Sequence, residues 1–115
     1  MTIRFYGIPN CDSVRKARAW LDAKRLAYEF HDFKKEGVDQ DHLRSWVEAV
    51  GWEVVLNRKG TTFRKLEAAQ KDNLDAEKAI RLMDAQPTTI KRPVIEHDGG
   101  VLVGFDADRW ESELG

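Results

Sequence analysis

The stretch YGIPNCDSVRKA, residues 6–17, holds the only cysteine of the chain, where a short apolar segment gives way to a charged helical pattern. Residues 3–6 have the character of a β-strand. From about Asp12 onward, apolar residues recur every three or four positions, as they do on the buried face of a helix. The stretch therefore predicts a strand, a turn and a helix, with Cys11 at the start of the helix.

A second strand is predicted over residues 27–33, where aromatic and polar side chains alternate. Because a helix separates this strand from the first, the two are expected to pair in parallel through a right-handed crossover. Residues 43–50 then place apolar side chains at i, i+3, i+4 and i+7, which predicts a helix that ends at Gly51.

The segment 51–73 is mixed, and its part 57–62 has turn residues and no period, so we predict a loop flanked by short helical turns. A third helix is predicted because apolar residues recur at i, i+3, i+4 and i+7, at Ala76, Ala79, Ile80 and Met83. Pro87 ends this helix.

The clearest hairpin signal is the pair of segments 93–97 and 101–103, joined by the turn Asp98-Gly99-Gly100. These strands are predicted to be antiparallel. The C-terminal segment predicts a last helix, with Asp106 as N-cap and with Trp110 and Leu114 facing inward.

The element order β-α-β, helices, β-β-α is that of an α/β protein with a mixed sheet, a thioredoxin-like fold with a helical insertion between its two halves. We predict one domain over residues 1–115, with the insertion at about 38–86. In this fold a reactive cysteine follows the first strand and a proline begins the third. Cys11 and Pro93 occupy these places.

The composition of the chain argues against several classes of function. The 115 residues include 19 basic and 20 acidic side chains, so the charge favours neither nucleic acid nor a membrane surface as partner. The start of the chain does not resemble a signal peptide, and a cytoplasmic location is predicted. The three histidines have no ligand partners at metal-binding spacing, so we expect no metal.

Cys11 has two interpretations. At a helix N-terminus, unpaired N–H groups and the helix dipole stabilise a thiolate, which makes the sulfur a nucleophile near neutral pH, although the adjacent Asp12 opposes this effect. Alternatively, Cys11 is a small apolar residue at a turn. Because position 14 is valine, a nucleophilic Cys11 has no second sulfur to resolve its adducts. Turnover would then need an external thiol such as glutathione.

Arg58 and Arg92 are the candidate anion-binding residues. Arg58 lies in the polar loop, and Arg92 precedes Pro93, the residue expected to approach Cys11 in this fold. A guanidinium near the sulfur would stabilise a thiolate and hold a carboxylate or an oxyanion. The alternative is that both are solvated surface arginines.

Three segments together carry a family resemblance: YGIPNC with RKARAWL in the first helix, LNRKGTTFRKL at 56–66, and IKRPVI at 90–95 followed by GVLVGF. The chain resembles the arsenate reductase (ArsC) and Spx family over nearly its whole length, and within it the small YffB-type members. The resemblance implies that Cys11 is the nucleophile, that Arg58 and Arg92 bind anions, and that the Arg92–Pro93 bond is cis.

Three positions depart from the family pattern. Gly7 and Gly104 stand where arsenate reductases carry a histidine and a third arginine, and Val14 stands where Spx carries a second cysteine. Losing an arginine weakens a site for a doubly charged oxyanion. The leading hypothesis is therefore a thiol reductase with no bound cofactor and with glutathione, or another small thiol, as cosubstrate. The alternatives are an Spx-like, non-enzymatic regulator that docks on RNA polymerase or another protein, and an arsenate reductase.

Overall fold

The computed structural model describes residues 3–115. The chain divides into two compact units. The first is formed by the described residues up to Glu36 together with Arg92–Gly115, and the second by Gly37–Lys91. The second unit is the helical segment that separates the two halves of the sheet along the chain, where the sequence predicts an insertion at about 38–86. The prediction of a single domain stays a prediction.

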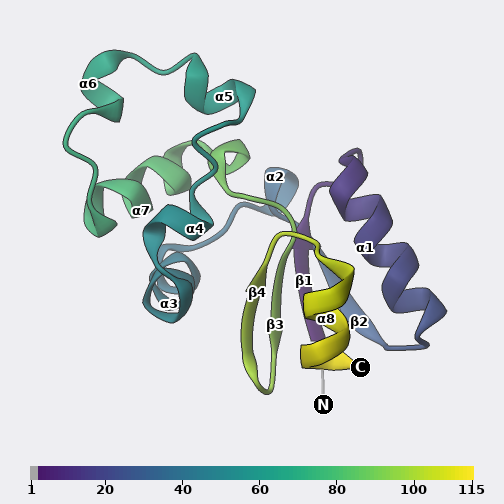
Figure 1. The fold of residues 1–115 in the computed structure, drawn as a ribbon. Helices are drawn as coiled ribbons and strands as arrows, with labels where there is room; N and C mark the ends of the chain where they lie inside the picture. The colour runs from purple at the N-terminus through teal and green to yellow at the C-terminus, as the bar shows by residue number, and fades with distance from the viewer. Residues whose placement is uncertain (1–2) are drawn as a thin grey trace. The chain divides into compact units, whose positions relative to one another are not determined.

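The first unit contains all four strands of the sheet and is an α/β structure (Figure 1). Its elements are β1 (Ile3–Gly7), α1 (Asp12–Ala23), β2 (Tyr28–Asp32), α2 (Phe33–Glu36), β3 (Val94–His97), β4 (Gly100–Val103) and α8 (Ala107–Leu114). The predicted fold class, a thioredoxin-like fold with a mixed sheet, is confirmed.

The strand order is β2-β1-β3-β4. β1 pairs with β2 in parallel, with Phe5 opposite Phe30, and with β3 in antiparallel, with Tyr6 opposite Val94. The hairpin pairs His97 with Gly100, so its turn consists of Asp98 and Gly99 and is one residue shorter than predicted. Because β1 and β3 run in opposite directions, the C-terminal end of β1 and the N-terminal end of β3 lie side by side at the same end of the sheet.

One face of the sheet packs against α1 and α8. Alternation along β1 directs Ile3 and Phe5 to this face, since successive side chains of a strand point to opposite sides. The buried cluster contains Ile3, Phe5, Val14, Ala17, Leu21, Ile95, Leu102 and Trp110. Its members come from three strands and two helices, so the cluster ties α1 to the sheet and fixes the position of the helix N-terminus.

The C-terminal helix is anchored by Trp110, whose side chain is fully buried. Its indole N–H donates to the carbonyl oxygen of Gly104 at 3.1 Å, and its ring meets Trp20 and Phe105 edge to face. Asp106 caps the helix by accepting from the N–H groups of its first turn. The predicted N-cap and the buried Trp110 are confirmed.

The second unit is helical. It contains α3 (Gln40–Val50), α4 (Trp52–Val55), α5 (Thr61–Arg64), α6 (Ala68–Lys71), α7 (Ala76–Ala85) and the 3-10 helix η1 (Pro87–Thr89). Its own buried core includes Leu43, Trp46, Val55, Ile80 and Met83. The long helices α3 and α7 are joined by an ion pair between Arg44 and Glu77 and by a hydrogen bond from Gln40 to Asp84.

The segment between α3 and α7 contains a turn flanked by the short helices α4 and α5, as predicted. α5 begins at Thr61, inside the stretch interpreted as loop, and Gly60 N-caps it. The preceding turn is held by backbone contacts from distant residues: Leu56 bridges Ile90, and Asn57 N donates to the carbonyl of Thr89 at 2.8 Å. A pairing between segments so far apart in the sequence leaves no local period.

None of the helices within residues 3–115 has the length and apolar character that crossing a membrane requires.

Candidate functional site

Cys11 is the N-cap residue of α1. Its backbone is extended (φ −102°, ψ 131°), its N–H donates to the carbonyl of Ile8 at 3.2 Å, and its carbonyl accepts from Arg15 N at 2.9 Å. The side chain is partly exposed and packs against the edge of the cluster beneath α1. The strand β1 and the short turn after it therefore deliver the sulfur to the start of the helix.

The environment of Cys11 lowers the pKa of its thiol. Partial burial acts in the opposite direction and is the largest single effect, but it is outweighed by the N–H of Val14, the side chain of Arg92 and the N–H of Ser13, which all favour the thiolate, with the charge of Arg92 in addition. The sulfur forms no side-chain cap hydrogen bond of ordinary geometry within the described residues. The two backbone N–H groups therefore act as nearby oriented dipoles.

Arg92 reaches this site because of strand order. It lies two residues before β3, whose start is at the same end of the sheet as the end of β1 and the turn that carries Cys11. The Arg92–Pro93 peptide bond is cis, and Pro93 is buried. The carbonyl of Pro93 accepts from Gly104 N at 2.8 Å, which joins this segment to the residue after β4.

The carboxylate of Asp12 is exposed and lies 2.6 Å from the guanidinium of Arg15, one helical turn further on. Arg15 holds the pKa of this carboxyl below its usual value. The negative charge beside Cys11 is thus paired with a cation in the first turn, and its repulsion of a thiolate is reduced. The i, i+3 spacing of the two residues is the sequence signal that would have revealed this pair.

Arg58 belongs to the second unit. Its guanidinium lies 5.4 Å from the centre of the Trp52 ring, in cation–π geometry. It also lines a pocket of about 290 Å³ to which Lys59 and Lys91 contribute positive charge and Glu53 a negative charge, so cations outnumber the carboxylate. The pocket is therefore a basic surface of the second unit, and the structure joins Cys11 and Arg92 within the first.

Gly7 and Gly104 occupy positions where a side chain is disfavoured for different reasons. Gly104 has φ of 79°, in the left-handed region that favours glycine, so an arginine there would be strained. At Gly7 the obstacle is space, because an added Cβ would lie 2.9 Å from Cγ2 of Val14. At both positions the local structure therefore disfavours a side chain.

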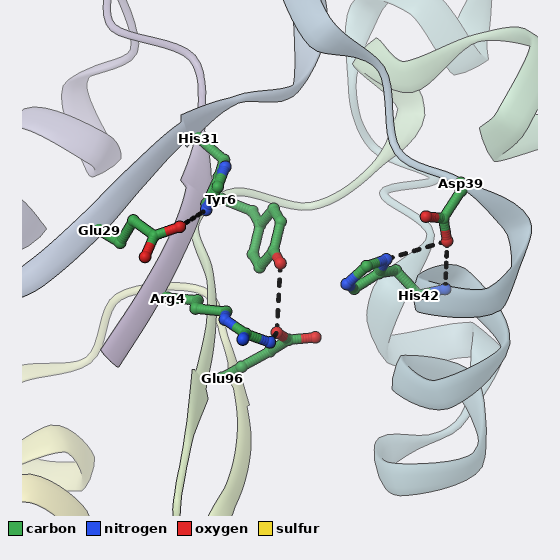
Figure 2. A network of polar contacts seen from close by, with 7 residues as sticks. All are labelled: Arg4, Tyr6, Glu29, His31, Asp39, His42 and Glu96. Carbon is green, nitrogen blue, oxygen red and sulfur yellow. Dashed lines mark hydrogen bonds and ion pairs between the residues drawn. The ribbon is translucent and has the colours of Figure 1, made fainter. Parts of the chain in front are cut away.

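The opposite face of the sheet carries a polar network (Figure 2). The Tyr6 hydroxyl donates to Glu96 at 3.2 Å, Arg4 lies 3.8 Å from the same carboxylate, and the Tyr6 ring stacks on His31. Burial and the neighbouring charge of Glu96 raise the pKa of Tyr6. The sequence pattern does not predict this network, because the network depends on the strand register that places Arg4 opposite Glu96.

Figure 2 also shows the start of α3 in the second unit. Asp39 Oδ1 accepts from the backbone N–H of His42 at 2.8 Å and lies 2.9 Å from Nδ1 of the same residue. The backbone N–H and then the ring of His42 lower the pKa of the Asp39 carboxyl. This contact is a helix cap, and it accounts for the position of both side chains.

Comparison with protein families gives a match to the ArsC family over residues 6–112. An uncharacterised protein of Haemophilus influenzae is 37% identical over 110 residues, which cover 96% of each chain. The global transcriptional regulator Spx of Streptococcus mutans is 30% identical over 103 residues, 87% of this chain and 74% of that protein.

Among solved structures, that of a protein named YFFB is 55% identical and superposes with a TM-score of 0.96, covering 98% of this chain and 99% of the other. Because 98% of this chain is covered, the match includes residues of both units.

Proposed function

The chain belongs to the ArsC family, and from this premise we propose that it is a glutathione-dependent thiol reductase with Cys11 as nucleophile. The observation that carries the proposal is the position of Cys11 at the N-cap of α1, where the first-turn N–H groups and Arg92 lower the pKa of its thiol. A thiolate present near neutral pH is what thiol–disulfide exchange requires. The cytoplasm, where glutathione is plentiful, is the proposed location.

In the proposed reaction the Cys11 thiolate attacks the glutathionyl sulfur of a mixed disulfide. A new S–S bond joins Cys11 to glutathione as the old one breaks, and the substrate leaves as a thiolate that takes up a proton. A second glutathione thiolate then attacks the glutathionyl sulfur on Cys11. Glutathione disulfide is released, and the Cys11 thiolate is restored without any other oxidant or reductant.

Arg92 is proposed to stabilise the thiolate, both before attack and as the leaving group of the second exchange. Its charge and hydrogen bonding already favour that form of Cys11. Arg58 is proposed, by family correspondence, to bind a carboxylate of glutathione. The basic pocket of the second unit, with Arg58, Lys59 and Lys91, supports this role because it is suited to an anionic group.

The proposal is tested by intact-mass measurement after exposure to glutathione disulfide. We expect the wild-type chain to gain one glutathione and to lose it on addition of excess reduced glutathione. Cys11→Ser, the matched control, should gain none. A wild-type chain that stays unmodified at neutral pH, or whose adduct is not released by glutathione, would contradict the proposed function.

A second candidate is a non-enzymatic regulator that binds RNA polymerase, favoured by the 30% identity to Spx over most of the chain. Such a protein would need its surface and not its sulfur. A pull-down of RNA polymerase by purified wild-type protein and by Cys11→Ser separates the two candidates, because equal capture by both proteins supports the regulator.

Arsenate is the weaker substrate hypothesis. A side chain at position 7 would collide with Val14, and an arginine at position 104 would have to adopt a left-handed backbone. A coupled assay for arsenite production tests it directly.

A further inference from the structure

Gly7, the last residue of β1, lies directly against Val14 on the first turn of α1. A Cβ at position 7 would lie 2.9 Å from Cγ2 and 3.4 Å from Cγ1 of Val14, and 3.2 Å from Cε1 of Phe5. The shortest of these separations is closer than carbon atoms tolerate, so some atom must move. Gly7 is not among the glycines with positive φ. Space, and not backbone freedom, therefore favours glycine here.

Val14 has little room to yield. Its side chain is fully buried within the cluster shared by α1 and the sheet, and a β-branched residue on a helix has one strongly preferred rotamer. A methyl group on residue 7 would therefore press on the turn of helix that carries Val14. Protein interiors are close-packed, so such a displacement is transmitted to the neighbouring backbone.

The turn that would move is the one that faces the sulfur. Cys11 is the N-cap of α1, so Ser13 and Val14 are the second and third helical residues, whose N–H groups an N-cap side chain uses. The side chain of Val14 thus contacts Gly7, while its backbone N–H is one of the groups that favour the Cys11 thiolate.

We propose that Gly7 and Val14 are a matched positioning pair: the bare backbone of Gly7 admits the isopropyl group of Val14, and this contact sets where the first turn of α1 presents its N–H groups to Cys11. The inference rests on the proposed function only in taking the Cys11 thiolate as the working group. It also implies that positions 7 and 14 must change together, so a larger residue at position 7 requires a smaller one at position 14.

The test is the pKa of Cys11, measured by the ultraviolet absorbance of the thiolate and by the pH profile of alkylation with iodoacetamide. Gly7→Ala is expected to raise this pKa by about half a unit or more, because the N–H donors move away from the sulfur. Val14→Ala removes the contact without pressing on the helix, so the donors shift less and the pKa should rise less. In the double variant, the added methyl group enters the space vacated by Val14, and the pKa should return most of the way to the wild-type value.

Ala17→Gly is the matched control, since it weakens α1 on the same buried face at a distance from Cys11. It should lower the melting temperature, and because it does not strain the Gly7–Val14 contact it should change the pKa much less than Gly7→Ala does. The inference is overturned if Gly7→Ala leaves the pKa unchanged, if the double variant keeps the shift of Gly7→Ala, or if Ala17→Gly shifts the pKa equally.

If Gly7→Ala does not fold, the double variant and Val14→Ala decide the question. Recovery of a folded chain with a near-wild-type pKa in the double variant supports the pair, and a double variant that also fails to fold while Val14→Ala folds contradicts it. No glutathione is present in these measurements, so their failure is distinct from failure of the adduct experiment that tests the proposed function.

Discussion

Arg92 and the first-turn N–H groups act on one atom, the sulfur of Cys11, and their contributions are separable by substitution. Arg92→Gln keeps a hydrogen-bond donor, on a shorter side chain, but removes the charge. We expect the pKa of Cys11 to rise by on the order of one unit, since a charge-assisted hydrogen bond is worth about 1.5–3 kcal/mol and the sulfur is partly exposed. Alkylation rates across the pH range measure the shift.

Lys91→Gln is the control for this substitution because it removes the neighbouring positive charge, which is exposed and does not figure among the groups that lower the pKa of Cys11. It should leave the alkylation profile unchanged. A pKa that rises equally in both variants would show that general charge, and not the placement of Arg92, stabilises the thiolate.

The lowered pKa of Cys11 also makes stability depend on pH. Its folded-state pKa lies below its unfolded value, so the thiolate stabilises the folded chain above the unfolded pKa, and this contribution is lost as pH falls through the folded-state pKa. We expect the free energy of unfolding of wild type, minus that of Cys11→Ser, to increase with pH across this window. Urea unfolding of both proteins under reducing conditions measures the difference.

Other titrating groups are the same in the two proteins, so they cancel from this difference. A difference that is flat or that decreases with pH would mean that burial dominates at Cys11 and that its thiol is the favoured form.

At the scale of elements, long helices and the hairpin were predictable because their patterns are local. α3 and α7 repeat apolar residues over more than two turns, and the hairpin is marked by a turn with glycine. The four-residue helix α2 was not predicted, since one turn is too short to display a period.

The candidate site was predictable in part for the same reason. Cys11 at the start of α1 follows from a local pattern, and the position of Arg92 before β3 follows from the order of elements. The contact between Gly7 and Val14 could not be predicted, because it depends on the distance at which the helix packs on the strand. The Tyr6–Glu96 hydrogen bond depends on strand register, which the hydrophobic pattern alone leaves open.

The C-terminal helix offers a test of element stability. Asp106 accepts from the N–H groups of Asp108 and Arg109, and the helix it caps carries the buried Trp110. Asp106→Ala should reduce the free energy of unfolding by about 1 kcal/mol, and Asp106→Asn, which retains an accepting oxygen, should reduce it much less. Chemical denaturation compares them. Equal losses in the two variants would show that the cap is not the source of the effect.

At the scale of the whole molecule, the chain has two units with separate buried cores and a single sulfur that is able to form a disulfide. Cys11, Arg92 and the Gly7–Val14 contact all lie in the first unit. The chemistry of the thiolate is therefore determined by residues of the sheet and α1. Arg58, in the second unit, is proposed to affect glutathione binding and is not needed to explain the lowered pKa.

Because the chain contains one cysteine, no intramolecular thiol can displace a group bound to Cys11. The rate of release of glutathione from the Cys11 adduct should therefore rise in proportion to the concentration of added thiol and extrapolate to zero without it. Val14→Cys is the comparator, since it places a second sulfur one helical turn from Cys11 and should add a release rate that is independent of external thiol. Both rates are measured by intact-mass analysis of quenched reaction samples. A wild-type adduct that is lost without added thiol would require a different reaction: hydrolysis, or attack by the Cys11 thiolate of a second protein molecule on the Cys11 sulfur, which forms a disulfide-linked dimer and releases glutathione as a thiolate. Dilution separates the two, because only the reaction between two protein molecules becomes slower when the protein is diluted.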